Sequence, residues 1–238
     1  MQRLREQAFD LFEIELDTHK LHQLQHYVEL MLGWEANLTA ITEPEAIAVK
    51  HLLDSMSLLY YIDFLPGSQV VDVGTGAGFP GLVLKILRPD LSLTLIESVG
   101  KKTAFLSHVV ETLKLERVQI VTARAEDVGQ EQAHREMYDY VVARAVAYLP
   151  TLAEYLLPLC KVGGRAIAMK GGSALNEVAD ASAAIEVLGG KFTTLHSVVL
   201  PTIEEPHILV VLDKVKLTPT AFPRRAGLPS KRPIEPEA

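Results

Sequence analysis

Alternating glycines follow a short β-branched run, and their spacing is the feature of the sequence that most directly suggests chemistry. Gly74, Gly76 and Gly78 stand directly after the run that ends at Val73. Glycine allows positive φ angles and lets a ligand approach the backbone closely, while the start of a following helix offers free N–H groups and a positive dipole end. Because ligands of open α/β sheets bind at such turns, the loop predicts a nucleotide-cofactor site.

Two cofactors fit this loop. The spacing Gly74-x-Gly76-x-Gly78 is typical of S-adenosylmethionine sites, whereas Gly76-x-Gly78-x-x-Gly81 matches a dinucleotide fingerprint. Glu97 ends the next expected strand, where an acid can accept hydrogen bonds from both ribose hydroxyls of either cofactor. The alternatives are a glycine-rich turn without a ligand, and a Glu97 that only stabilises the start of the following helix.

The elements that must position this loop alternate between strands and helices. Strands are expected at 69–73, 91–96, 118–122, 138–143, 165–169, 192–200 and 207–212, and helices at 101–115, 149–159 and 173–188. The alternation predicts right-handed βαβ units in a mostly parallel sheet, and the short final link predicts an antiparallel edge hairpin. A nicotinamide enzyme of this size would need a substrate domain or a catalytic Tyr-Lys or His pair, and we find neither. We therefore predict an α/β, Rossmann-like, seven-stranded S-adenosylmethionine-dependent methyltransferase fold.

Helical and basic segments flank the predicted sheet. Residues 1–66 are predicted to be an N-terminal helical region, with one helix over 43–61. The methyltransferase domain is assigned to 67–215, and 216–238 to a basic, proline-rich C-terminal tail. From Thr218 onward this tail is not expected to pack as an element. It would either grip nucleic-acid phosphates or remain a solvated, disordered segment.

Composition limits the other classes of protein. Cys160 is the only cysteine among 238 residues, which excludes an intramolecular disulfide and a cysteine-rich zinc site. No apolar stretch is long enough to cross a bilayer. We expect a cytoplasmic monomer without a metal. The net charge of -7 argues mildly against a nucleic-acid partner, but binding depends on where the cations sit, and here they crowd the C-terminal end.

Several separate segments carry a combined pattern. They are Trp34 with Asn37-Leu38-Thr39, His51-Leu52-Leu53-Asp54-Ser55, Asp72 through Gly81, Gly100-Lys101-Lys102, Ala143-Arg144-Ala145, Lys170-Gly171, and the tail segments Phe222 through Gly227 and Pro229 through Pro233. From about Leu21 to the end, the chain resembles the bacterial small-subunit ribosomal RNA methyltransferase G family, also called RsmG or GidB. Ala77 stands where many members have proline. Because the glycines that set the turn are intact, we expect the same cofactor.

The resemblance implies methylation of guanine N7 in 16S ribosomal RNA, at the position conventionally numbered 527. The substrate would be the RNA itself or the small-subunit particle. Cofactor contacts carry over to Gly74, Phe79, Glu97, Ser98, Val99, Ala125, Glu126 and Arg144, and the loop adds Gly76 and Gly78. Contacts to RNA are predicted for Asn37, His51, Arg144, Lys170, Arg224 and Arg225.

The residues fit such chemistry. Guanine N7 carries a free lone pair and no proton, so its methylation needs alignment of the reactants rather than a general base. The end of the fourth expected strand lacks the Asp/Asn-Pro-Pro-aromatic signature of exocyclic-amine enzymes, and no Pro-Cys nucleophile is present. Arg144 and Lys170 are the predicted catalytic residues. Arg144 would orient the cofactor or base, or form a salt bridge; Lys170 would contact phosphate or base, or be solvated.

Two further points stay open. His51 and Asp54 lie one helical turn apart and can share a face on the substrate side, or be a core histidine and a surface acid. The competing functions are a nicotinamide-dependent oxidoreductase and a non-catalytic RNA-binding module.

Overall fold

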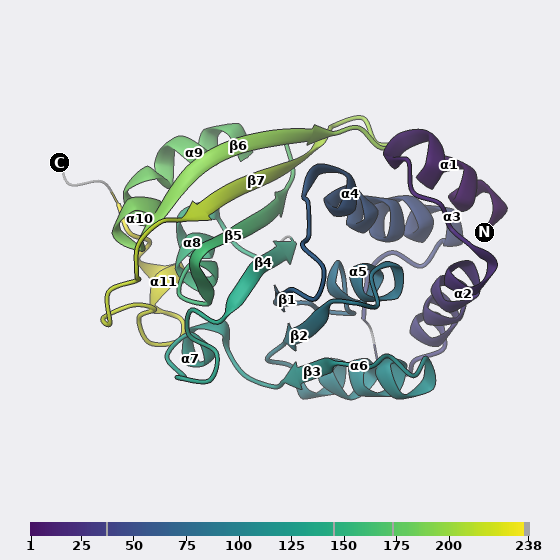
Figure 1. Cartoon of the computed structure of the whole chain (residues 1–238), viewed down its shortest axis with the longest axis horizontal. Helices are drawn as coiled ribbons and strands as arrows, with labels where there is room; N and C mark the ends of the chain where they lie inside the picture. The colour runs from purple at the N-terminus through teal and green to yellow at the C-terminus, as the bar shows by residue number, and fades with distance from the viewer. Residues whose placement is uncertain (37, 145, 173, 236–238) are drawn as a thin grey trace.

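A seven-stranded sheet runs through the middle of the molecule, with helices on both faces (Figure 1). The computed structural model describes residues 1–36, 38–144, 146–172 and 174–235. The strands are β1 (Gln69–Val73), β2 (Ser92–Ile96), β3 (Val118–Val121), β4 (Tyr138–Arg144), β5 (Cys160–Lys170), β6 (Gly190–Val198) and β7 (His207–Lys214). Their order is β3-β2-β1-β4-β5-β7-β6. The first five strands pair in parallel, and β7 pairs antiparallel with both β5 and β6. This confirms the predicted fold class.

Burial on both faces explains the composition of the central strands. Val70, Val71 and Val73 of β1 are all buried, as expected for a parallel strand covered by helices on each side. β5 begins five residues earlier than predicted because the preceding helix, α8 (Leu149–Leu156), ends before Cys160. Burial raises the pKa of the Cys160 thiol to about 12, so this cysteine is an inert part of the core.

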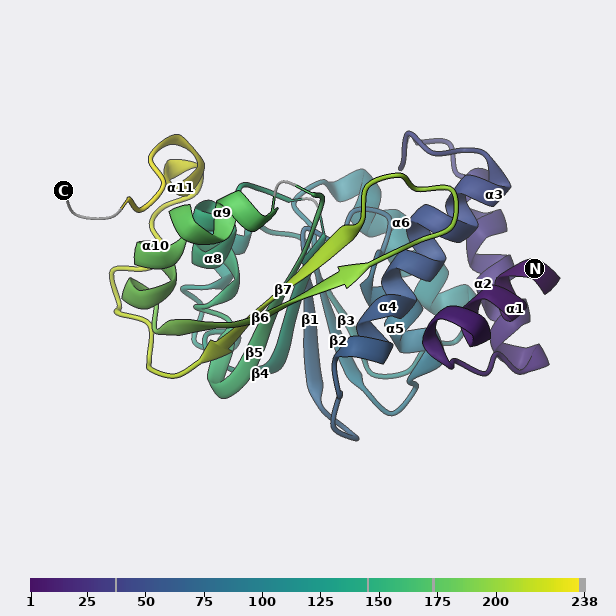
Figure 2. The ribbon, with the colours of Figure 1, turned by 90° about the horizontal axis from the view of Figure 1, so that it is seen from above.

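Two helical layers enclose the sheet (Figure 2). One face carries α5 (Gly81–Leu87) and α6 (Gly100–Thr112) together with the N-terminal helices. The other carries α7 (Ala125–Val128), α8, α9 (Ala174–Asp180) and α10 (Ser182–Val187). The single helix expected over 173–188 is two helices from Ala174 onward, with a break at Ala181, and its first residue lies outside the described residues. No helix in the described ranges is both long and apolar enough to cross a membrane.

The N-terminal region consists of α1 (Gln2–Phe12), α2 (Thr18–Leu32), α3 (Pro44–Ile47), a π-helical turn (Ala48–Leu53) and α4 (Asp54–Tyr61). The last three replace the one helix expected over 43–61. Leu4, Ala8 and Phe12 face inward from α1 and share a buried cluster with α5 and α6. The helical region therefore packs directly onto the sheet domain.

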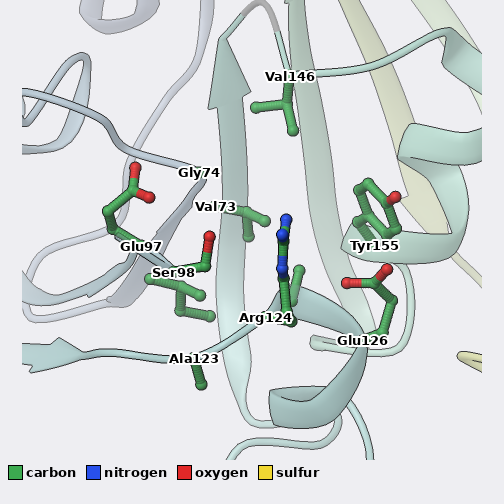
Figure 3. A pocket seen from close by; sticks show the side chains of 11 residues that line it. Val73, Gly74, Glu97, Ser98, Ala123, Arg124, Glu126, Val146 and Tyr155 are labelled. Atoms are coloured by element: carbon green, nitrogen blue, oxygen red, sulfur yellow. The ribbon is translucent and has the colours of Figure 1, made fainter. Parts of the chain in front are cut away.

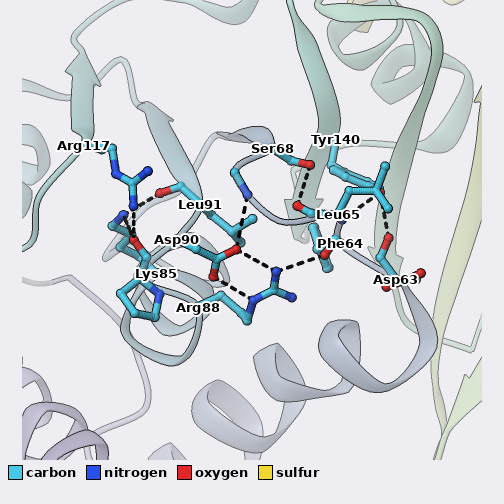
Figure 4. A network of polar contacts seen from close by, with 12 residues as sticks. Asp63, Phe64, Leu65, Ser68, Lys85, Arg88, Asp90, Leu91, Arg117 and Tyr140 are labelled. Atoms are coloured by element: carbon cyan, nitrogen blue, oxygen red, sulfur yellow. Dashed lines mark hydrogen bonds and ion pairs between the residues drawn. The ribbon is translucent and has the colours of Figure 1, made fainter.

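A polar network fixes the chain where this region enters the sheet (Figure 4). Arg88 donates to both carboxylate oxygens of Asp90 at 2.8 Å and to the carbonyl of Phe64 at 3.0 Å. The hydroxyl of Tyr140 on β4 donates to the carbonyl of Asp63 at 2.6 Å. These bonds give two backbone carbonyls of the linker between α4 and β1 their hydrogen-bond donors. They tie the linker to the end of α5 and to β4.

The C-terminal segment, residues 218–235, packs against α7 and α8 and contains a short helix, α11 (Leu228–Lys231) (Figure 1). The expectation that residues from Thr218 on do not pack as an element is therefore wrong for the part that the structure describes. Arg135 explains much of the difference, because its guanidinium donates to the carbonyls of Thr218, Pro219 and Phe222. Proline-rich backbone has few N–H groups of its own, and here its carbonyls find donors in the folded domain.

Candidate cofactor and acceptor site

A pocket of about 240 Å³ opens at the carboxyl ends of β1, β2 and β3 (Figure 3). We call it the cofactor pocket. It is lined by Val73, Gly74, Ile96, Glu97, Ser98, Ala123, Arg124, Ala125, Glu126, Val146 and Tyr155. Five of the predicted cofactor residues, Gly74, Glu97, Ser98, Ala125 and Glu126, lie on its wall. The sequence therefore located this pocket, although it missed part of its lining.

Gly74 forms the floor where β1 ends. Its φ is 67°, and a Cβ there would lie 2.9 Å from a methyl group of Val146. Its N–H donates to the carbonyl of Ile96 at 2.8 Å, which ties the loop to the end of β2. Glycine is thus required both by the backbone angle and by the close approach of the chain beyond β4.

Glu97 is buried and held in place on the pocket wall. Its two carboxylate oxygens accept from the N–H groups of Gly76 at 3.1 Å and Val99 at 2.9 Å, and Lys102 lies at 4.0 Å. Each carboxylate oxygen has a second lone pair, so the group can still accept from hydroxyls in the pocket. A nucleoside ribose fits this acid and the glycine floor beside it.

Asp72 stabilises the loop from beneath. One of its carboxylate oxygens accepts from the hydroxyl of Thr75 at 2.6 Å and the N–H of Gly81 at 2.8 Å. Its other oxygen has no partner among the described residues. Burial raises the pKa of this carboxyl to about 6, because the charged form loses its hydration.

The other predicted cofactor residues lie beside the pocket rather than on its wall. Gly76 and Val99 turn their N–H groups toward Glu97. Gly78 is closely packed, since a Cβ there would lie 2.4 Å from Leu82. Phe79 is buried under the His51 ring, with centroids 4.5 Å apart. Arg144, which was also predicted to contact the cofactor, lines a second pocket instead.

This second pocket, of about 290 Å³, lies at the carboxyl ends of β4 and β5, and we call it the acceptor pocket. It is lined by Ile41, Lys50, His51, Asp54, Arg144, Met169, Lys170, Gly171 and His207. Arg144 and Val146 are two residues apart in the chain, yet they line different pockets. The two pockets are therefore neighbours, joined by the end of β4.

Arg144 is held by contacts on three sides. Nη1 donates to the Lys50 carbonyl at 3.0 Å and to Asp54 at 3.2 Å, and Nη2 donates to Nδ1 of His51 at 3.0 Å. The guanidinium carbon lies 5.1 Å from the centre of the Phe79 ring. Nε and the second Nη2 proton have no acceptor among the described residues.

His51 is neutral in this arrangement. Burial and the charge of Arg144 lower the pKa of its imidazole to about 4. Because an arginine can only donate, Nδ1 must be the acceptor, and Nε2 therefore carries the proton toward the Thr39 hydroxyl at 2.9 Å. The wide π-helical turn places this ring over Phe79. Turns of this kind are frequent at functional sites.

Asp54 is buried and bridges Arg144 and His207. One oxygen accepts from Arg144, and the other accepts from Nδ1 of His207 at 2.8 Å. The hydrogen bond to Asp54 raises the pKa of His207. The predicted common face of His51 and Asp54 is thus observed, and both residues contact Arg144.

Lys170 is not solvated. Its Nζ donates to the carbonyl of Ala147 at 2.7 Å and lies 2.7 Å from a carboxylate oxygen of Glu177. The alternative of a solvated lysine is therefore wrong, and a contact of Lys170 with phosphate or base stays a prediction.

Of the other residues predicted to contact RNA, those that the structure describes are not among the lining residues of the acceptor pocket. Arg225 is exposed. Arg224 is not free to grip phosphates, because its guanidinium lies 2.6 Å from the fully buried carboxylate of Glu154. Asn37 lies outside the described residues.

Three lining residues lacked a strong sequence signal. His207 is the first residue of β7, and in an antiparallel strand the first residue lies at the carboxyl edge of its parallel neighbours. That rule could have found it. Tyr155 lies in the apolar helix α8, where an aromatic residue ordinarily belongs to the core. Arg124 directly precedes the predicted pair Ala125 and Glu126.

The strand order and the edge hairpin are those of S-adenosylmethionine-dependent methyltransferases. A methyltransferase of this class from Aquifex aeolicus superposes with a TM-score of 0.54 at 16% identity, covering 73% of this chain and 94% of that one. TrmN from Thermus thermophilus superposes with a TM-score of 0.53 at 20% identity, covering 68% of this chain and 48% of TrmN. Likeness at this level of identity shows the fold alone.

The sequence shows the family. A family model described as rRNA small subunit methyltransferase G matches residues 20–208. Curated proteins of the same name are 50% identical in Roseiflexus sp. (strain RS-1), over 93% of this chain and 94% of that protein, and 45% identical in Desulforamulus reducens, over 96% of each. The chain belongs to this family and is an S-adenosylmethionine-dependent methyltransferase. This finding decides against both the oxidoreductase and the non-catalytic module.

Proposed function

We propose that the chain methylates N7 of the guanine conventionally numbered 527 in 16S ribosomal RNA. Family membership supports methyl transfer to small-subunit ribosomal RNA; the base and the atom are our proposal. S-adenosylmethionine would supply an electrophilic methyl group from the cofactor pocket. The residues of the acceptor pocket would bind and orient the base.

The observation that best supports this proposal is that Asp54 and His51, in the acceptor pocket, are both hydrogen-bonded to Arg144. The two oxygens of Asp54 accept hydrogen bonds from Arg144 and His207, and Nδ1 of His51 accepts from Arg144. Both groups therefore hold Arg144 in place, a role that does not involve a proton from the substrate. An acceptor that needs no deprotonation fits this arrangement, and guanine N7 is such an acceptor.

The free donors suit the same edge of the base. Guanine O6 lies beside N7 and is a hydrogen-bond acceptor. Nε and the second Nη2 proton of Arg144, with the remaining proton of Lys170, would donate to O6 or to a flanking phosphate. N7 itself would stay unbonded and face the cofactor pocket. The base must leave its stack to reach this position.

Mapping of N7-methylguanine tests the proposal. Purified enzyme is incubated with labelled S-adenosylmethionine and small-subunit RNA from cells that lack the corresponding gene, and the modified nucleotide is located by chemical cleavage. We expect one N7-methylguanine at 527. Glu97→Ala and Arg144→Ala should each reduce methyl transfer while the far-UV circular dichroism stays native. A label on an exocyclic amine or another base contradicts the proposal.

We also propose a cytoplasmic monomer that acts on RNA or on the assembled small-subunit particle. Parallel incubations with naked 16S RNA and with purified particles would distinguish the two substrates. Sedimentation equilibrium would test the monomer. A stable dimer would contradict that part alone.

A further inference from the structure

We propose that the C-terminal segment is the outer support of the cofactor pocket, and that Arg224 and Gly227 act as positioning residues for cofactor binding. The proposal rests on the placement of S-adenosylmethionine in the pocket that Glu97 and Glu126 line. It assigns to this segment a role other than the RNA contact that its basic composition suggests.

The segment directly contacts a side chain of the pocket wall. Glu126 is buried at the start of α7, and one of its carboxylate oxygens accepts from the N–H of Gly227 at 2.8 Å. Gly227 has a φ of 78°, which favours glycine and aims its N–H inward. Without the segment, this carboxylate would lose a backbone donor and gain freedom to rotate.

A second wall residue is supported from the same side. Tyr155 of α8 lies beside Glu126 on the pocket wall in Figure 3. Burial raises the pKa of its hydroxyl, and a hydrogen bond with the side chain of Ser230 acts in the opposite direction. One helical turn earlier, the hydroxyl of Thr151 donates to the carbonyl of Pro229 at 3.1 Å. The segment thus contacts α8 along the side that holds Tyr155.

The buried ion pair between Arg224 and Glu154 anchors the segment. The backbone N–H of Arg224 donates to Glu154 at 2.7 Å, and its guanidinium makes three further bonds to the same carboxylate, at 2.6 to 3.1 Å. Glu154 is fully buried. Removing one partner of such a pair leaves an uncompensated buried charge, so loss of the Arg224 side chain should release the segment from α8.

Neighbouring arginines provide a matched test. Arg225 carries the same charge but is exposed. Isothermal titration with S-adenosylhomocysteine should show a dissociation constant at least tenfold higher for Arg224→Gln than for wild type, and no change for Arg225→Gln. The double variant Glu154→Gln/Arg224→Gln leaves no buried charge and retains an acceptor for the backbone N–H, so it should recover much of the affinity. Unchanged affinity in Arg224→Gln, or an equal loss in both single variants, overturns the proposal.

Hydrogen exchange on the wild-type protein tests the same link without any variant. Because coupling is reciprocal, saturating S-adenosylhomocysteine should slow exchange across 222–231, above all at the Gly227 amide. Unaltered exchange there would overturn the proposal even if Arg224→Gln failed to fold. Glu97→Ala distinguishes failure of the role given to the C-terminal segment from failure of the proposed function. If Glu97→Ala weakens binding while Arg224→Gln does not, only the role of the segment fails; if wild type does not bind, the proposed function fails.

Discussion

Arg144 combines a charge, a plane and a set of directed donors, and its contacts use all three. A lysine at this position would keep the charge but could not bond His51 and the Lys50 carbonyl together while covering Phe79. We expect Arg144→Lys to reduce methyl transfer by about 100-fold, the size of effect expected when a reacting group is misplaced by about 1 Å. Affinity for S-adenosylhomocysteine should change little, because Arg144 lies outside the cofactor pocket. Single-turnover kinetics and titration would measure the two effects; wild-type turnover would contradict the role given to Arg144.

His51 should make stability depend on pH in a defined direction. The pKa of its imidazole is about 4 in the folded chain, against 6.5 for an unperturbed histidine. The folded state therefore binds fewer protons, so the contribution of neutral His51 is complete above pH 6.5 and is lost as the pH falls toward 4. This interval corresponds to on the order of 3 kcal/mol.

The matched variant is His51→Asn, which offers Arg144 an acceptor but does not titrate. Urea unfolding at pH 7, 6 and 5 should show wild type losing stability relative to this variant as the pH falls. His207 has its pKa shifted the opposite way, but it is present in both proteins and cancels in the difference. A difference that is independent of pH would contradict a neutral, buried His51.

At the residue level, the sequence predicted which residues line the site better than it predicted which side chains pair with one another. The acid at Glu97 and the pair Ala125 and Glu126 could be placed because they follow predicted strands of a known kind of sheet. The pairing of Arg224 with Glu154 could not, since the two are 70 positions apart and no local pattern records which buried acid meets which arginine. Composition indicated only that Arg224 was one of many basic residues.

The glycine loop shows how one element meets two separate steric demands. Gly74 and Gly76 have similar φ angles, 67° and 62°, but a Cβ at Gly74 would meet Val146 at 2.9 Å, while one at Gly76 would meet nothing within 4 Å. Gly76→Ala should therefore cost only backbone strain, about 1–2 kcal/mol. Gly74→Ala should cost more and should also weaken binding of S-adenosylhomocysteine. Urea unfolding and titration would measure both.

The double variant Gly74→Ala/Val146→Ala isolates the contact within this element. Removing the valine methyls removes the clash with the new Cβ. The double variant should therefore be destabilised only by about the amount that backbone strain alone costs. If Gly74→Ala and Gly76→Ala were equally destabilised, close approach of the chain beyond β4 would not be the reason for glycine at this position.

Elements were predictable where one periodicity dominated, and less so where packing changed it. The seven strands follow from β-branched runs and turn residues. The helix over 43–61 was expected as one regular element, yet its middle is a π-helical turn that carries His51. Such a turn has the same apolar composition as an α-helix, so its position depends on tertiary contacts with Phe79 and Arg144 rather than on local preference.

Charge over the whole molecule must be reconciled with an RNA substrate. The net charge is -7, so binding requires cations gathered on one side rather than a basic protein. The cations of the C-terminal segment divide into two kinds. Arg224 neutralises a buried acid, while Arg225 and Lys231 are exposed. The folded segment thus supports the cofactor pocket in our proposal and exposes two cations, which we predict to contact RNA.

Salt dependence can test which cations meet RNA. Each phosphate contact to single-stranded nucleic acid contributes about 0.7 to the slope of log affinity against log salt. The variant Arg225→Gln/Lys231→Gln should therefore bind small-subunit RNA more weakly and lower the slope by about 1.4, as measured by filter binding over a salt series. Lys191 and Lys216 are exposed near the start of β6 and the end of β7, at the end of the sheet away from both pockets, and their glutamine variants should leave the slope unchanged. An equal decrease in slope for both pairs of variants would mean that RNA binding depends only on the net charge of the protein. The C-terminal segment would then not orient the RNA toward the acceptor pocket.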